Sequence, residues 1–124
     1  YLGISFETDN PRDLPQISLD QTKIRQALFN LLRNAQESIQ HTHGRILFSA
    51  SAVPDGVQIT ISDNGCGMTE DQIENAFRPF VTYKPGGTGL GLAVTRQIIE
   101  AHQGTLCVES TPKEGTSFYI FLPG

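Results

Sequence analysis

The sequence has no tryptophan, one methionine and two cysteines, and none of its apolar runs approaches the length of a membrane-spanning segment. Cys66 and Cys107 are far apart and lack metal-site spacing, so we expect reduced thiols and a cytoplasmic location. No signal-peptide pattern opens the chain, although a longer parent protein can still be membrane-anchored. Basic residues are not in excess either. The net charge of -4 argues against nucleic acid, or membrane contact, as a role of this domain.

The composition that remains is that of a soluble globular domain, with 38% hydrophobic and 18% charged residues. Its length fits one two-layer core, and we predict a single domain over residues 1–124. The chain opens and closes with strand-like segments. We therefore expect it to be one domain of a longer polypeptide.

The segment 57–68 carries the most informative pattern. Apolar and polar residues alternate over 57–62, as they do in a half-buried strand. Every second side chain lies on one face of a strand, so Asp63 follows three aliphatic residues on the inward face. A carboxylate in that position needs hydrogen-bond donors. The glycines that follow, Gly65 and Gly67, let the backbone approach another group closely.

Two interpretations of Asp63 are open at this point. In the first, the strand delivers an acceptor to a glycine-walled hollow that holds a ligand. In the second, Asp63 only caps an Asx-type turn, which is a common role for Asp before Asn-Gly.

The remaining periodicities predict a short α/β chain. An N-cap at Asp20 indicates a helix with a clear apolar seam, and a Pro-Asp-Gly turn joins two antiparallel strands that end at Asp63. The expected elements are an edge strand Gly3–Thr8, a helix Gln21–Gln40 (buried seam Ile24, Leu28, Leu31, Ala35 and Ile39), a strand Arg45–Val53, a short helix Glu70–Ala76, a helix Gly89–Ala101 (buried stripe Leu90, Val94, Ile98 and Ala101) and two closing strands Thr105–Glu109 and Thr116–Leu122.

Two asparagines lie side by side on the first long helix. Asn30 and Asn34 are four residues apart, beside the buried seam, although asparagine is a mediocre helix former. Amide oxygens suit Mg²⁺ or its bound waters. The alternative is that both are partly solvated residues without a role.

A long loop over 77–88 leads into a glycine-rich helix start. Gly87, Gly89 and Gly91 leave the backbone N–H groups of this helix start accessible, which favours phosphate binding, and Lys84 can add a cation. The spacing fits neither the dinucleotide fingerprint nor the G-K-[ST] phosphate loop. A flexible loop before a helix is the alternative. The Asp63 carboxylate can accept a hydrogen bond from the amino group of an adenine. Together with the paired amides and the phosphate-binding helix start, it points to one ligand, Mg-ATP.

These segments resemble, in order, the motifs of the catalytic and ATP-binding domain of sensor histidine kinases, within the superfamily of gyrase, heat-shock chaperone and mismatch-repair ATPases. Arg33 in the first of these motifs and the Phe-Val-Thr-Tyr-Lys sequence of the 77–88 loop, which we call the lid, are similar to those of nitrogen-regulator-type kinases. Asn30–Ala35 resembles the N box, Asp63–Met68 the first glycine box, Phe77–Phe80 the F box, Gly87–Leu92 the second glycine box, and Gly115-Thr116 the last small box.

The resemblance implies a fold and a set of roles. The fold is the Bergerat ATP-binding fold: an α/β (α+β) two-layer sandwich, a mixed, mostly antiparallel sheet with helices on one face. Asn34 would be the Mg²⁺ ligand, and Asn30 stands where related ATPases carry a water-activating glutamate. The implied catalytic residues are Asn30, Asn34 and Lys84, and the implied nucleotide-binding residues are Asn34, Asp63, Gly65, Gly67, Met68, Phe80, Lys84, Gly87, Thr88, Gly89, Leu90, Gly91, Leu92 and Thr116.

The implied function is to bind Mg-ATP and donate its γ-phosphate to a histidine on a separate dimerisation domain, upstream of a response regulator. This chain contains no phosphoacceptor histidine motif. One turn after Asn34, where many members carry a basic residue and then an aromatic one, Glu37 and Ser38 stand instead. The alternatives are a gyrase-like ATPase, an anti-sigma-type serine kinase, both expected to be acidic at Asn30, and an inactive ATP-binding regulatory module.

Overall fold

The periodicities described above become helices and strands at nearly the expected places. The computed structural model describes residues 5–9 (backbone only), 19–39, 43–78 and 91–124. Its elements are β1 (Ser5–Asp9), α1 (Gln21–Ser38), β2 (Arg45–Val53), β3 (Gly56–Asp63), α2 (Glu70–Asn75), α3 (Gly91–Ala101), β4 (Thr105–Thr111) and β5 (Gly115–Pro123).

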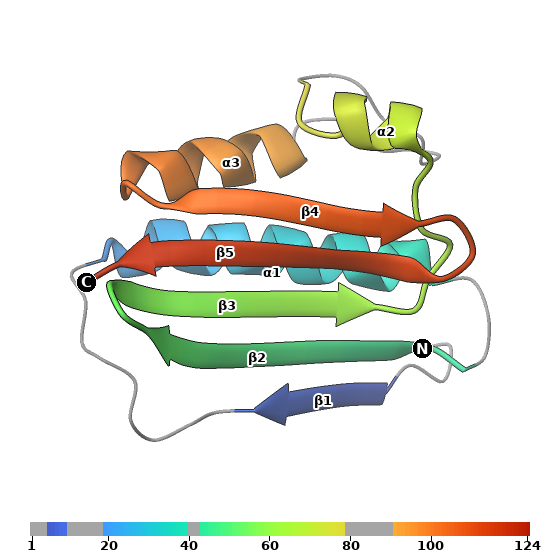
Figure 1. The fold of residues 1–124 in the computed structure, drawn as a ribbon, viewed down its shortest axis with the longest axis horizontal. Coiled ribbons are helices and arrows are strands. Elements are labelled where there is room, and N and C mark those ends of the chain that lie inside the picture. The colour runs from blue at the N-terminus through green and yellow to red at the C-terminus, as the bar shows by residue number, and fades with distance from the viewer. Residues whose placement is uncertain (1–4, 10–18, 40–42, 79–90) are drawn as a thin grey trace.

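The strands form one five-stranded sheet in the order β1-β2-β3-β5-β4 (Figure 1). The pairing of β1 with β2 is parallel and the other three pairings are antiparallel, so the predicted mixed, mostly antiparallel sheet is confirmed. β3 is the central strand, between β2 and β5. Asp63, the last residue of β3, is paired with Ile46 of β2 and with Thr116 of β5.

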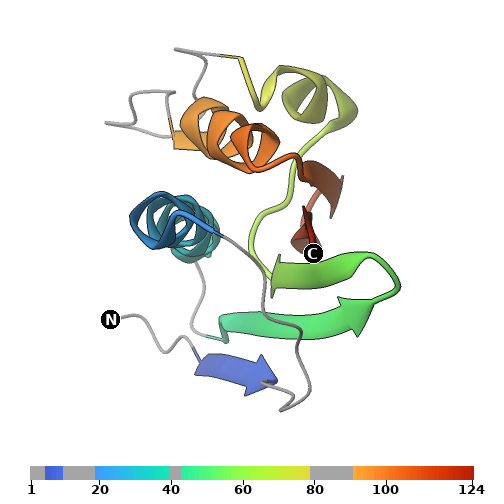
Figure 2. The same ribbon diagram turned by 90° about the vertical axis from the view of Figure 1, so that its left-hand side faces the viewer.

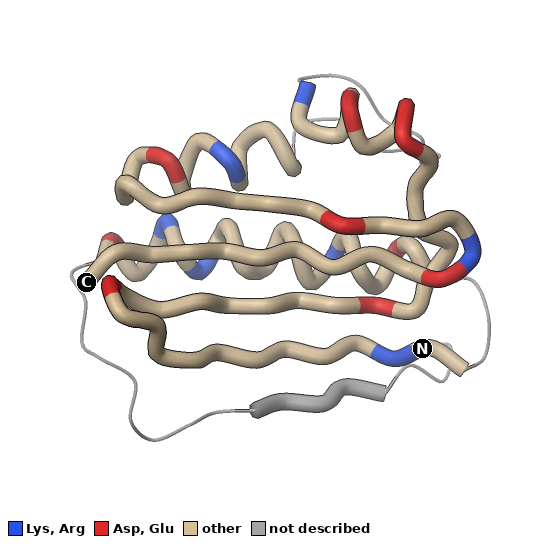
Figure 3. Tube along the Cα trace, in the orientation of Figure 1, with Lys and Arg blue, Asp and Glu red and all other residues tan. Residues whose placement is uncertain are grey.

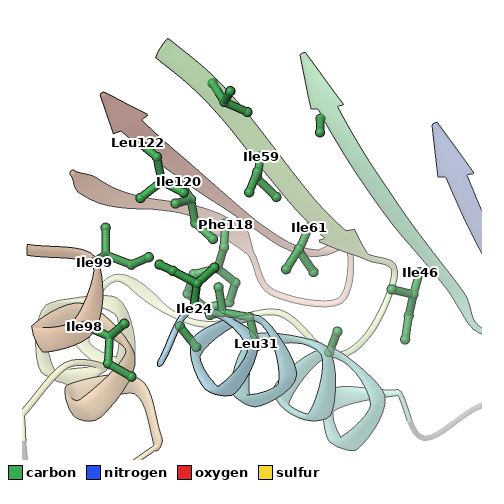
Figure 4. Close-up of a cluster of buried hydrophobic side chains, with 14 of the residues drawn as sticks. Ile24, Leu31, Ile46, Ile59, Ile61, Ile98, Ile99, Phe118, Ile120 and Leu122 are labelled. Atoms are coloured by element: carbon green, nitrogen blue, oxygen red, sulfur yellow. The ribbon is translucent and has the colours of Figure 1, made fainter. Parts of the chain in front are cut away.

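Helices α1 and α3 cover one face of the sheet (Figure 2). The core lies between these helices and the sheet, and it consists of side chains from the helices and from the inward face of the strands (Figure 4). Alternating burial along β5 follows from its period of two, with Phe118, Ile120 and Leu122 almost completely buried. The helix α1 contributes a buried face of Ile24, Ala27, Leu31 and Ala35. The two-layer sandwich with helices on one face is therefore confirmed.

The N-terminus of α1 is fixed as predicted, but its C-terminus is not. The Asp20 side chain accepts a hydrogen bond from the Lys23 amide at 3.1 Å, which satisfies a helix-terminal donor. The helix ends at Ser38 because Ile39 is already extended, with φ -90° and ψ 115°. The predicted end, Gln40, is outside the described residues.

The buried face of α3 was predicted incorrectly in part. Ala101 is exposed, whereas Thr95 and Ile99 are fully buried beside Ile98. Thr95 can be buried because its hydroxyl donates to the Gly91 carbonyl at 2.7 Å, so no polar group is left without a partner. The helix is described from Gly91, and the predicted first residues, among them Leu90, are outside the described part.

Candidate functional site

Asp63 is the one charged residue of β3 and stands at its end (Figure 3). Strand alternation places its side chain on the same face as Val57, Ile59 and Ile61, which are all buried against the helices. The carboxylate is therefore directed to the helix layer, where the sheet ends.

The Oδ1 atom of Asp63 accepts two hydrogen bonds that fix its orientation. One comes from the Gly65 amide at 2.8 Å and the other from the Ser38 hydroxyl at 3.1 Å. The first is the Asx-type bond of the simple turn interpretation. The second comes from the last residue of α1. The turn interpretation is therefore confirmed, and the ligand interpretation stays a prediction.

The glycine turn after β3 is packed closely between α1 and the β4–β5 turn. A Cβ atom on Gly65 would lie 2.3 Å from the Ser38 Oγ, and one on Gly67, whose φ is +69°, would lie 2.0 Å from the Thr111 carbonyl oxygen. Room for a flat base on the open side of these glycines stays a prediction. The glycines are required because protein backbone occupies the space that a side chain would need.

Thr116 links this turn to the neighbouring hairpin. Its side chain is buried, and its hydroxyl lies 2.7 Å from the Ser110 Oγ. The Ser110 hydroxyl also lies 2.9 Å from the Gly115 carbonyl oxygen and accepts from the Met68 amide at 2.8 Å, so either hydroxyl of the Ser110–Thr116 pair can be the donor to the other. In either case Thr116 retains acceptor capacity next to the end of β3.

Two polar contacts hold α3 antiparallel to α1. At the start of α3, the Asn30 side-chain amide donates to the Gly91 carbonyl at 3.4 Å. At its end, the Nε2 atom of His102 accepts from the Asp20 amide at 3.0 Å. Asn34 is half-buried one turn after Asn30. Both asparagines therefore lie on the side of α1 that meets the start of α3.

The segment that would close the site over these residues is only partly described. Phe80, Lys84, Gly87, Thr88, Gly89 and Leu90 lie outside the described residues. The first aromatic residue of this loop is anchored, because Phe77 packs edge-on against Phe118 with 6.5 Å between ring centroids and lies under Arg96. A Cβ on Gly91 would meet no atom of the described residues within 4 Å, and Leu92 packs against the core.

A hollow of about 210 Å³ does lie beside Asp63, but neither Asn30 nor Asn34 lines it. It is lined by Arg45, Leu47, Ser62, Asp63 and Asn64. Arg45 and Leu47 are exposed on the sheet face away from Ile46 and the helices. The hollow for a purine, between α1 and the lid, stays a prediction.

Two residues of the site were not assigned a role from the sequence. Ser38 was noted only as a departure from the family pattern, yet it is four residues after Asn34 and so lies on the same side of α1. Ser110 is paired with Thr116 between β4 and β5. The helical i, i+4 spacing from Asn34 could have identified Ser38 from the sequence. Ser110 could be identified only once the register of β4 with β5 was known.

The model of one protein family, described as "Histidine kinase-, DNA gyrase B-, and HSP90-like ATPase", matches residues 19–124 of this sequence. The chain belongs to this family. The histidine kinase- and gyrase-like ATPase domain thus extends over α1, the glycine turn, α3 and all strands except β1.

Relatives of this ATPase domain include sensor kinases. Sporulation kinase B of Bacillus subtilis (strain 168) is 41% identical over 123 residues, which are 99% of this chain and 28% of that protein. The structure of the mycobacterial sensor histidine kinase MprB superposes with a TM-score of 0.85 at 30% identity, and the match covers 98% of this chain and 83% of that one. Full-length ShkA, solved in complex with AMPPNP, gives a TM-score of 0.79 at 30% identity, over 98% of this chain and 26% of that one.

The ATPase domain accounts for a minor part of such kinases, since it spans just over a quarter of Sporulation kinase B. In the described part of the chain, no helix is both long and apolar enough to cross a membrane. Cys66 and Cys107 are both exposed free thiols.

Proposed function

We propose that residues 1–124 form the catalytic domain of a longer protein-histidine kinase, which binds Mg-ATP and donates its γ-phosphate to a histidine on a separate dimerisation domain. The observation that carries the proposal is the Asp63 carboxylate. It is held at the end of β3, on the helix side of the sheet, by donors from Gly65 and Ser38. Membership of an ATPase family supports the choice of nucleotide.

The role of Asp63 is to accept a hydrogen bond from the amino group of adenine. An ionised carboxylate only accepts hydrogen bonds, so it matches an exocyclic amino group and repels a carbonyl at the same ring position. The Thr116 hydroxyl has two acceptor lone pairs, of which the contact with Ser110 uses at most one, so it offers a second acceptor nearby. The carboxylate is the group that favours adenine over guanine.

The amides of α1 suit a magnesium ion. No group of three or more His, Cys, Asp or Glu side chains that could hold a metal occurs among the described residues, so a dedicated protein cage is not available there. Mg²⁺ typically takes few protein ligands together with substrate phosphates and waters. Asn34 would supply one oxygen ligand. Bound Mg²⁺ would neutralise charge on the phosphates, and Lys84 and the second glycine box would contact the same groups.

Asn30 favours transfer over hydrolysis. Its amide cannot take a proton from water, and its Nδ2 already donates to Gly91. The acceptor is then a neutral imidazole nitrogen, which forms a bond to the γ-phosphorus while the bond to the oxygen of ADP breaks. The imidazole loses its proton to solvent. Positioning and charge neutralisation supply most of the rate.

The partners follow from this assignment. They are the dimerisation and phosphoacceptor domain of the same kinase and, downstream, a response regulator. We propose a cytoplasmic location, because ATP and reduced thiols such as the exposed Cys66 and Cys107 belong to that compartment.

Phosphotransfer to a histidine is tested by mixing this chain with the histidine-bearing domain of its own parent protein and γ-labelled ATP. We expect label on that domain that is lost in acid and kept in base. Acid-stable label would indicate a serine kinase, and absence of label at saturating ATP would indicate a binding module. Hydrolysis by this chain alone at about 1 per second or faster would contradict the kinase assignment.

Asn34→Ala is expected to remove most of the Mg²⁺-dependence of ATP binding, because the lost amide oxygen is the proposed metal ligand. Calorimetry with and without Mg²⁺ measures this, and we expect the ratio of the two dissociation constants to fall by about tenfold. Gln36→Ala is the matched control, since Gln36 is an exposed amide of the same helix. An unchanged ratio in Asn34→Ala would exclude Asn34 as the ligand.

A further inference from the structure

Ser38 is placed where α1, the glycine turn and the end of β3 meet. It is the last residue of α1 and is half-buried. Its carbonyl accepts from the Cys66 amide at 2.9 Å, and its hydroxyl reaches both the Ala35 carbonyl at 2.8 Å and the Asp63 Oδ1 at 3.1 Å.

The Ser38 hydroxyl has one hydrogen and two acceptors within reach. Hydrogen bonds to an ionised group are roughly twice as strong as those between neutral groups. The Ala35 carbonyl also lies in the last turn of α1, where side chains commonly compete for backbone groups. The charged acceptor, Asp63, is therefore the favoured partner whenever its carboxylate is ionised.

The donors from Ser38 and Gly65 act on the same carboxylate oxygen. The terminal torsion of an aspartate is broad and roughly two-fold, so each donor from a fixed element narrows the range of orientations of the carboxylate plane. A second donor on Oδ1, from another element, fixes both the plane and the oxygen that faces the glycine turn. A fixed plane matters because hydrogen bonds weaken steeply away from linear geometry.

We infer that Ser38 is a positioning residue for base recognition: its hydroxyl holds the Asp63 carboxylate in the orientation that accepts the amino group of adenine. The inference rests on the proposed role of Asp63. It extends that role to a residue of α1, so that the helix carrying Asn34 at the metal also orients the acceptor for the base. Metal site and base site then share one rigid element.

The test compares ATP with purine riboside triphosphate, which carries hydrogen in place of the amino group. Calorimetric dissociation constants for both ligands are measured on this chain and on Ser38→Ala, Ser38→Thr and Ser51→Ala. Ser51 is an exposed serine of β2 and serves as the matched control. Thermal unfolding without nucleotide reports whether each variant is folded.

We expect this chain to prefer ATP over purine riboside triphosphate, and Ser38→Ala to reduce that preference by about tenfold while its affinity for purine riboside triphosphate stays unchanged. Ser38→Thr retains the hydroxyl and should retain the preference, as should Ser51→Ala. A purely structural role of Ser38 would instead weaken both ligands equally, which would overturn the inference.

The two levels of the proposal fail in different ways. If the unmodified chain binds both ligands equally well, the role of Asp63 in base recognition is wrong, and the role of Ser38 is wrong with it. If the unmodified chain prefers ATP and Ser38→Ala keeps that preference, only the inference about Ser38 is wrong.

Discussion

Replacing Asp63 by Asn should weaken ATP binding by about 100-fold or more. The Oδ1 position must accept from the Gly65 amide and the Ser38 hydroxyl, so the amide oxygen of the variant is expected to occupy it. The amide NH₂ group then takes the other position and faces the amino group of adenine, donor against donor. The loss of a hydrogen bond to a charged group, worth about 1.5–3 kcal/mol, adds to the cost of an unsatisfied donor. Calorimetric titration with Mg-ATP measures the effect.

The matched control is Asp55→Asn, the same change in the exposed turn between β2 and β3. It should leave the affinity unchanged. The Asp63→Asn variant is nearly isosteric, so we expect it to keep the fold and to unfold close to the temperature of the unmodified chain. ATP affinity equal to that of Asp55→Asn would remove Asp63 from the nucleotide site.

Local patterns were sufficient for those parts of the fold that depend on neighbours in sequence. Alternation over 57–62 placed β3 and the inward direction of Asp63, and Asp20 marked the start of α1. These features follow from the period of two in strands and from unpaired amides at helix N-termini. The central hairpin of β2 and β3 was likewise predictable, because Pro54-Asp55-Gly56 is a short turn between two alternating segments.

Features that depend on approach between distant segments were not predictable in the same way. The glycine turn was correctly expected to allow close approach, but the approaching groups are Ser38 and Thr111, which no local pattern identifies. The burial of Thr95 was also missed, although the acceptor of its hydroxyl, the Gly91 carbonyl, lies only four residues earlier in the same helix. The position of β5 between β3 and β4 also arises from tertiary packing.

The candidate site divides along the same line. Asn30, Asn34 and Asp63 are on regular elements, and the structure brings the end of α1 to the end of β3 through Ser38. Lys84, Gly87 and Thr88 belong to a segment without helical or strand period, and together with Gly89 and Leu90 they lie outside the described residues. Their contacts with phosphate stay predictions that rest on the family motif.

Gly67→Ala should destabilise the fold by about 2–4 kcal/mol. The φ of +69° costs an L-residue about 1–2 kcal/mol, and the added Cβ would lie 2.0 Å from the Thr111 carbonyl oxygen, a backbone atom that cannot move without disturbing the β4–β5 turn. For a domain of this size we expect the midpoint of thermal unfolding to fall by roughly 10 °C. Circular dichroism without nucleotide measures the shift.

Gly91→Ala is the matched control: it is the same substitution, but we expect no loss of stability. Among the described residues, no atom lies within 4 Å of a Cβ at Gly91, and this residue is the first described one of α3, so alanine should leave stability equal or raise it by up to about 1 kcal/mol. Equal stability of the two variants would show that Thr111 can yield, and that Gly67 is not fixed by backbone contact. A large loss in Gly67→Ala alone would mean that the glycine closes the turn against β4, and that space for adenine must lie on the other side of Asp63, toward α1 and the lid.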